Sequence, residues 1–146
     1  MKTVKQIFLP KRLAAILFLF TSQMFLFFEN SYAQNSKWIA PKDADNLKNP
    51  VQSNPVTLKE GKTLYATYCV ACHGEKGKGD GAAASGLAVK PADHSSAVVQ
   101  NQSDGAIFWY MSEGRNPMPS YKQAFTETQR WELVNYIRTL AKTPKK

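Results

Sequence analysis

The clearest hydrophobic pattern in the chain lies near its C-terminal end. Apolar residues recur there at helical spacing, namely Leu133, Tyr136, Ile137, Leu140 and Ala141. Such a stripe is typical of an amphipathic helix with one buried face. The segment Thr126-Glu127-Thr128-Gln129 precedes the stripe and has the spacing of a capping box, so we expect the helix to begin there.

A second helix is predicted in the middle of the chain. Leu58, Gly61, Leu64, Tyr65 and Tyr68 follow one another at mostly helical spacing. Residues 57–60 have the form of a capping box, which would start this helix. Glycine in a helix costs ~1 kcal/mol relative to alanine. Because Gly61 stands on the apolar face, we expect another backbone to approach closely there.

A third, shorter helix is predicted after Ser103, a residue type that commonly caps helices. Ile107, Phe108 and Met111 follow it at helical spacing, and Gly114 is suited to end the element. No alternating run is long enough to predict a sheet. With 146 residues the chain has room for one ordinary domain. We therefore expect an all-α domain.

The first 33 residues have the order of a secretory signal peptide. Four basic residues precede an apolar run at 13–28, and a small-residue pattern ends at Ala33. The run is shorter than the ~20 apolar residues that a membrane-spanning helix needs. We expect cleavage after Ala33 and hence an exported, periplasmic protein. An uncleaved segment would instead tether the protein to a membrane.

Residues 34–55 predict an extended, proline-rich arm or linker, since Pro41, Pro50 and Pro55 punctuate a polar stretch. Its lone tryptophan, Trp38, would dock onto the domain surface or onto a partner. The helical domain is expected to occupy residues 56–142, and a short basic tail follows at 143–146.

Charge narrows the classes of partner. Removing residues 1–33 takes four of the 19 Lys and Arg residues and one of the 11 Asp and Glu residues, which leaves a net charge of +5. This charge forms no basic stripe, so we expect no binding to nucleic acid. Two cysteines in an exported protein would ordinarily predict a disulfide, but the residue that follows them indicates another use.

The two cysteines are Cys69 and Cys72, and His73 follows directly. C-x-x-C-H predicts covalent attachment of one haem c. On a helical turn, positions i and i+3 share a face, so both thiols can reach one porphyrin while the imidazole reaches its iron. A thioredoxin-like motif would need a neighbouring βαβ pattern. A structural zinc site would need a fourth ligand, for which only His94 remains.

The segment after the motif, residues 74–81, is rich in glycine. Such a chain turns sharply and lets the backbone lie against a flat ligand. A phosphate-binding loop is not indicated, because no strand leads in and no G-K-[ST] closes the segment. Leu87, Val89 and Pro91 then form a short apolar stretch that we expect to line the haem pocket.

The second axial ligand of the iron decides the function. Met118 lies between two prolines on a stiff loop, whereas Met111 has the spacing of a core residue and His94 lies in a polar run typical of the surface. We therefore assign Met118 as the ligand, with His94 second. His/Met ligation raises the potential of the iron and suits electron transfer. An open sixth position would instead indicate a haem enzyme or a gas binder.

Residues 57–142 resemble a class I monohaem c-type cytochrome of the bacterial, periplasmic type. They carry a leading helix, Cys-x-x-Cys-His-Gly, a glycine-rich loop, a Met-Pro loop and a final amphipathic helix in the order of that family. The resemblance implies a small cytochrome c fold with three to five helices around a covalently bound haem. In this fold the first helix would cross the last, with Gly61 and Tyr65 meeting Leu133 and Tyr136.

Two further residues are assigned to the haem site, and the first of them follows from the same resemblance. The carbonyl of Pro91 would accept a hydrogen bond from the imidazole of His73, which would orient the ring. Tyr121, at the end of the Met-Pro loop, would contact the haem. The expected function is single-electron transfer between periplasmic or membrane redox partners. A fixed cytochrome subunit of a respiratory or dehydrogenase complex is the alternative.

Five lysines lie around the haem-binding segments, namely Lys62, Lys76, Lys78, Lys90 and Lys122. A basic ring of this kind would steer the protein to an acidic patch on a redox partner. The same lysines would also serve solubility alone. A rate of electron transfer that depends on ionic strength would favour the first interpretation.

Overall fold

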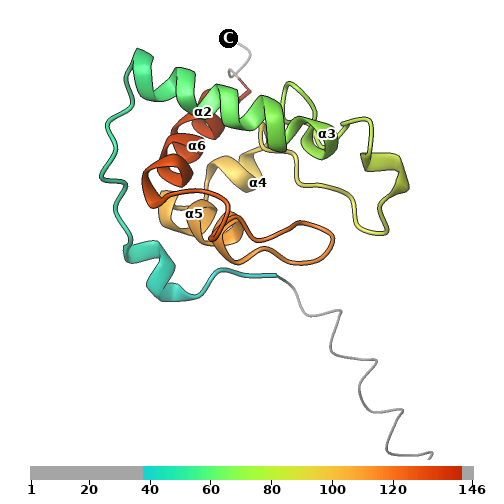
Figure 1. The fold of residues 1–146 in the computed structure, drawn as a ribbon. Helices are drawn as coiled ribbons and strands as arrows, with labels where there is room; N and C mark the ends of the chain where they lie inside the picture. Colours follow the sequence, from blue (N-terminus) through green and yellow to red (C-terminus); the bar gives the residue numbers. More distant parts are fainter. Residues whose placement is uncertain (1–37, 143–146) are drawn as a thin grey trace, which may run out of the picture. The chain divides into compact units, whose positions relative to one another are not determined.

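The computed structural model describes residues 38–142, and within them the chain is helical. The elements are the 3-10 helix η3 (Lys42–Asn46), α2 (Pro55–Tyr68), α3 (Val70–His73), the 3-10 helix η4 (Ala84–Gly86), α4 (Ala97–Gln100), α5 (Asp104–Glu113) and α6 (Glu127–Thr139) (Figure 1). This part of the chain contains no strand, only an isolated bridge between Arg115 and Met118. The predicted all-α fold is confirmed.

Several predictions of the sequence fall outside this range. The signal peptide at 1–33, the first residues of the arm and the basic tail at 143–146 lie outside the described residues.

The chain divides into two units after Trp38, and the second, Ile39–Lys146, holds all of the described helices. None of those helices is long and apolar enough to cross a membrane. The role of Trp38 stays a prediction.

Helices α2 and α6 cross closely at Gly61, as expected. A Cβ at this glycine would overlap the carbonyl oxygen of Glu132 on α6, so only glycine lets the two backbones approach this far. The rings of Tyr65 and Tyr136 pack beside the crossing with centroids 5.2 Å apart. Leu133 is 1% exposed and belongs to the same core. The predicted crossing is therefore confirmed.

The helix ends follow local side-chain chemistry. Thr126 and Gln129 form the predicted capping box of α6, and Ser103 caps α5 by accepting a hydrogen bond from the N–H of Ala106. The predicted start of α2 was wrong. Its N-cap is Asn54, which forms a capping box with Thr57 while Pro55 occupies the first turn. Proline is favoured at that position because the N–H it lacks would have no helical partner.

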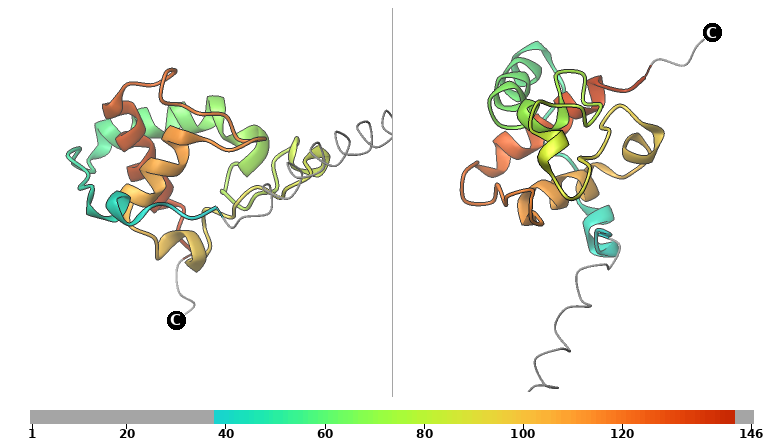
Figure 2. Two further views of the ribbon diagram at one scale, coloured as in Figure 1. Left: turned by 90° about the horizontal axis from the view of Figure 1, so that it is seen from below. Right: turned by 90° about the vertical axis from the view of Figure 1, so that its right-hand side faces the viewer.

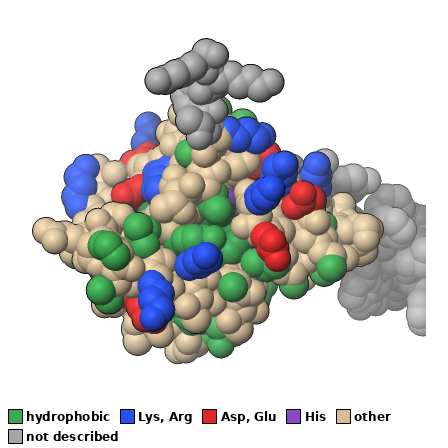
Figure 3. Space-filling view, turned by 90° about the horizontal axis from the view of Figure 1, so that it is seen from above, with side chains coloured by type: hydrophobic (Ala, Val, Ile, Leu, Met, Phe, Trp, Pro, Cys, Tyr) green, Lys and Arg blue, Asp and Glu red, His purple; other side chains and the backbone are tan. Residues whose placement is uncertain are grey.

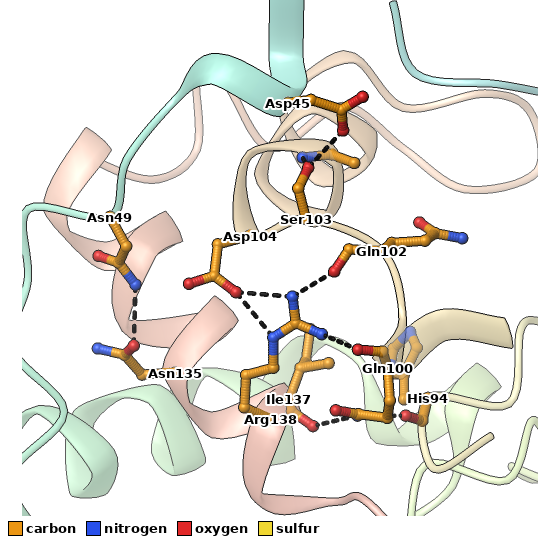
Figure 4. Close-up of polar contacts among 11 residues, drawn as sticks. Asp45, Asn49, His94, Gln100, Gln102, Ser103, Asp104, Asn135, Ile137 and Arg138 are labelled. Carbon is orange, nitrogen blue, oxygen red and sulfur yellow. Dashed lines mark hydrogen bonds and ion pairs between the residues drawn. The ribbon is translucent and has the colours of Figure 1, made fainter. Parts of the chain in front are cut away.

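The arm that precedes α2 is packed against the helices, although its sequence indicated no packed element. Ala44 in η3 is 3% exposed, and its carbonyl lies so close to Gly105 of α5 that a Cβ there would overlap it. Farther along, the Asn49 side chain donates to Asn135 of α6 (2.8 Å), which in turn donates to the carbonyl of Val51 (3.0 Å). The Asn49 contact is drawn in Figure 4.

Arg138 joins the last helix to α4 and α5 (Figure 4). Its Nε and a terminal nitrogen each lie 2.7 Å from one carboxylate oxygen of Asp104. The two terminal nitrogens donate to the carbonyls of Gln100 (2.8 Å), the last residue of α4, and Gln102 (2.6 Å), two residues beyond it. The guanidinium thus satisfies carbonyls that a short helix leaves without partners.

The haem-binding motif lies to one side of this helical framework. Figures 1 and 2 place α3 and the loop that follows it beside α2, α5 and α6 rather than among them. In both figures the loop between α5 and α6, which carries Met118, extends on the same side as α3. The fold therefore brings the two sequence-predicted ligand segments to one side of the domain.

Candidate haem site

The cysteine motif forms a single helical turn at the end of α2. The carbonyl of Cys69 accepts hydrogen bonds from the N–H groups of Cys72 (3.2 Å) and His73 (2.8 Å). This turn brings both thiols onto one face, and neither cysteine forms a disulfide. His73 ends α3 and is 8% exposed. The spacing of the motif therefore produces the geometry that the sequence predicted.

The thiols are unlike those of a redox-active C-x-x-C pair. Burial first, and the neighbouring Cys72 second, raise the pKa of Cys69 to about 12. Catalytic thiols of this spacing have a depressed pKa, about 7 in thioredoxin, because the thiolate is the reactive form. The raised pKa of Cys69 keeps its thiol protonated, which argues against a thioredoxin-like function.

The glycine-rich loop completes the hydrogen bonding of α3. N–H groups of the loop donate to the carbonyls of Cys72 and His73, from Gly81 (3.1 Å) and Gly79 (2.8 Å) respectively. The last carbonyls of a helix otherwise lack partners. The glycines at these positions thus allow close packing against the protein's own backbone, and their contact with a flat ligand stays a prediction.

The proximal imidazole is oriented by a backbone carbonyl, but not by the one predicted. The Nδ1 atom of His73 donates to the carbonyl of Ala92 (3.0 Å), so the assignment of this role to Pro91 is corrected by one residue. The Pro91 carbonyl instead lies against Gly79, whose φ of +70° leaves no room for a Cβ beside it. With Nδ1 engaged, Nε2 is the nitrogen left for a metal.

The protonation state of His73 suits a metal ligand. Burial lowers the pKa of this imidazole, and the bond to the Ala92 carbonyl only partly opposes the effect. A neutral imidazole is the form that binds metals. His73 thus needs to lose no proton near neutral pH before it can act as a ligand.

His94 is not the surface residue that its polar neighbours indicated. Its ring stacks on that of His73, with centroids 4.0 Å apart and planes 17° from parallel. Its Nδ1 lies 3.2 Å from the hydroxyl of Tyr65, which is 1% exposed. Two imidazoles that bind one iron from opposite sides point their nitrogens at each other across the metal. Face-to-face rings at this distance do not have that arrangement.

The loop that carries Met118 is held in a tight turn. The N–H of Met118 donates to the carbonyl of Arg115 (2.8 Å), and the N–H of Arg115 donates back (2.9 Å). The intervening Asn116–Pro117 peptide is cis. Met118 is partly buried and packs against the core cluster, whereas Met111 is itself a core residue, 5% exposed. The core position predicted for Met111 is confirmed, and the ligand role of Met118 stays a prediction.

Tyr121 lies beside the cysteines, and its contact with the haem stays a prediction. Its hydroxyl donates to the carbonyl of Tyr68 (3.2 Å), directly before Cys69. Burial first, and then Cys69 and Cys72, raise the pKa of Tyr121 to about 12. Its N–H donates to the carbonyl of Met111 (2.9 Å). Tyr121 therefore ties the loop between α5 and α6 to the cysteine turn.

The donor set fits a covalently bound haem better than it fits zinc. Two unpaired thiols share a turn, and the adjacent imidazole is neutral with one nitrogen uncommitted. Among residues 38–142, no group of three or more His, Cys, Asp and Glu side chains is arranged to hold a metal ion. The apolar stretch expected to line the pocket includes Val89, whose side chain is 64% exposed.

The predicted lysines lie on the surface of the domain. All five of them, Lys62, Lys76, Lys78, Lys90 and Lys122, are exposed. Figure 3, which views the face carrying α2, shows hydrophobic side chains gathered in a patch with Lys and Arg side chains around it and a histidine at its edge. Lys122 also pairs with Glu113 (3.3 Å), so its charge is partly neutralised.

The helical fold and the cysteine–histidine turn together define a c-type cytochrome. In agreement, the family model described as cytochrome c matches residues 58–141, which is more than half of the chain. The chain belongs to the cytochrome c family. Membership implies covalently bound haem c and a role in electron transfer. A search of curated proteins finds no match to this sequence.

A solved structure with a similar fold belongs to a larger assembly. It is a chain of the reducing HAO-like protein complex of Kuenenia stuttgartiensis, 28% identical in sequence, with a TM-score of 0.58. The match covers 66% of this chain and 50% of that chain. The present protein thus corresponds to about half the length of its structural neighbour.

Proposed function

We propose that the protein is an exported class I monohaem cytochrome that carries single electrons between protein partners. The observation that carries this proposal is the turn that holds Cys69, Cys72 and His73 together, with the imidazole oriented through Nδ1. Haem c, when bound, supplies a one-electron couple. Cys69 and Cys72 would form the two thioether bonds, and His73 would bind the iron through Nε2.

Met118 is proposed as the second axial ligand. Its backbone is held in a hydrogen-bonded turn, and its side chain packs at the core rather than in solvent. The competing methionine, Met111, is enclosed within α5, and His94 stacks beside the proximal ring. A thioether ligand raises the potential of the iron. With both axial positions held by protein there is no open coordination site for substrate, which favours a carrier over an enzyme.

The test is the spectrum of the protein made in a host that matures c-type cytochromes. The wild type should be red, and its oxidised form should show the weak far-red band of sulfur-to-iron ligation. Met118→Ala should lose that band, because the thioether is removed. Met111→Leu should retain it and serves as the matched control, since it keeps a core residue of similar volume.

Three outcomes would contradict the proposal. A folded wild-type protein that stays colourless with two free thiols would exclude haem c. Retention of the far-red band in Met118→Ala would exclude Met118 as the ligand. A wild type without the band would favour the alternative of an open sixth position.

The second candidate function is a fixed cytochrome subunit, which is favoured by the likeness to a chain of a multi-protein complex. The arm before α2 offers an attachment surface, since Ile39 is 62% and Leu47 is 45% exposed. Deleting the whole arm would also remove the buried Ala44, so surface substitutions are the cleaner probe. A double variant, Ile39→Ser with Leu47→Ser, should leave the protein soluble and active if it is a free carrier.

The two candidates differ in what the arm variant does in the native host. A fixed subunit would co-purify with a membrane complex, and the double variant would be released from it. Val98→Ser on α4, where the side chain is 77% exposed, is the control that should change nothing. Export is tested separately by N-terminal sequencing of the mature protein, whose first residue should be Gln34.

A further inference from the structure

The proximal imidazole is contacted by two residues of one short segment. The carbonyl of Ala92 accepts the hydrogen bond from Nδ1 of His73, and the ring of His94 lies parallel to the same imidazole at 4.0 Å. The hydrogen bond fixes the position of one ring atom. A flat neighbour on one face limits the rotation of the whole ring. The two contacts together define the plane of the imidazole more closely than either contact alone.

His94 is itself held firmly on several sides. Its Nδ1 lies 3.2 Å from the hydroxyl of Tyr65 on α2, and its N–H donates to the carbonyl of Gly77 (2.6 Å). Its own carbonyl accepts from the side-chain amide of Gln100 (2.6 Å), which also donates to the carbonyl of Ile137 (2.9 Å). Figure 4 shows Gln100 between these two carbonyls. The ring of His94 is thus held by α2, and its backbone is held by α4 and, through Gln100, is linked to α6.

We propose that His94 is a positioning residue that sets the plane of the axial imidazole of His73. The inference rests on the proposed haem function. Groups around a ligating histidine orient its ring and tune the metal, and haem proteins vary these levers to set their potential. An aliphatic side chain could fill the same volume but would present no flat surface. A specific effect of the stacked ring is therefore separable from packing.

The experiment compares three variants of the mature holoprotein by electron paramagnetic resonance of the low-spin ferric state. His94→Leu removes the flat ring but keeps an apolar side chain, and its largest g value should shift from that of the wild type. His94→Phe restores a flat ring without a nitrogen and should return the g value to that of the wild type. Tyr65→Phe removes only the hydroxyl next to Nδ1 and should broaden the signal.

The reduction potential supplies a second readout. It should shift in His94→Leu and return towards the wild-type value in His94→Phe, whereas Val98→Ala on the exposed face of α4 should leave it unchanged. The far-red band should persist in all four variants, because the proposed thioether ligand is untouched. Persistence of the band separates a change in the proximal ring from a loss of axial ligation.

Two results would overturn the inference. Wild-type g values in His94→Leu would show that the stacked ring sets nothing. Equal shifts in His94→Leu and His94→Phe would show that volume, rather than a flat surface, is what matters. Should His94→Leu fail to fold, an unaltered line width in Tyr65→Phe would overturn the inference instead. A wild type without covalent haem would refute the proposed function, before any variant of His94 is made.

Discussion

Replacing Gly61 with alanine would place a methyl group between the two longest described helices. A Cβ at this position would overlap the carbonyl oxygen of Glu132 and lie 3.0 Å from the Cβ of Tyr136. Alanine favours a helix by about 1 kcal/mol over glycine, whereas overpacking a tight contact costs about 1–3 kcal/mol. Because the overlapped atom belongs to the backbone of α6, we take the upper end of the second range. The net loss of stability should be about 2 kcal/mol.

The loss can be measured by thermal and guanidinium unfolding of the holoprotein, monitored by far-UV circular dichroism. A loss of about 2 kcal/mol should lower the Tm by roughly 8–16 °C in a domain of this size. Gly86→Ala is the matched control, since a Cβ at Gly86 would meet nothing within 4 Å. The reasoning fails if Gly61→Ala melts at or above the wild-type temperature, or if the control loses as much.

Two further predictions concern charged groups. Arg138→Lys should lower the free energy of unfolding by about 1–2 kcal/mol, because one ammonium cannot reach the Asp104 carboxylate and two carbonyls together. Lys122→Ala removes an exposed ion pair and should lower the free energy of unfolding in urea by under ~0.5 kcal/mol. Equal losses of stability in Arg138→Lys and Lys122→Ala would contradict this account. Hydrogen bonds from Ser95, and after them the contact with Lys142, lower the pKa of Asp93 below its ordinary value of 3.8. The resulting stabilisation is present above pH 3.8 and is lost as the pH falls through the folded pKa. Asp93→Asn should therefore flatten the acid side of the stability curve, and a curve with the wild-type slope would refute the assignment.

The helices were largely predictable because their signals are local. The capping box at Thr126 is confirmed, and so is the stripe from Leu133 to Leu140. Ala141, which was predicted to continue the stripe, lies beyond the helix and is exposed. The start of α2 was wrong because two capping patterns overlap there. Asn54 with Thr57 begins the helix three residues earlier than Thr57 with Glu60 would, and Pro55 fits the first turn of the earlier start.

The candidate site was predictable only where its chemistry lies in one short motif. Cys69, Cys72 and His73 lie within a single turn, so their spacing alone indicates the geometry. The carbonyl that orients His73 was misassigned by one residue, because that choice depends on how Pro91 packs against Gly79. No periodic signal in the sequence marks such a contact.

The sequence by itself determined the helical class, the covalent attachment motif and the glycine at which two helices cross. Each of these depends on the spacing of residues along the chain or on the absence of a side chain. Only the tertiary structure decided that the arm packs on α5 and that His94 stacks on His73. Those contacts join residues far apart in the sequence. Their geometry depends on packing and backbone hydrogen bonds that no local pattern encodes.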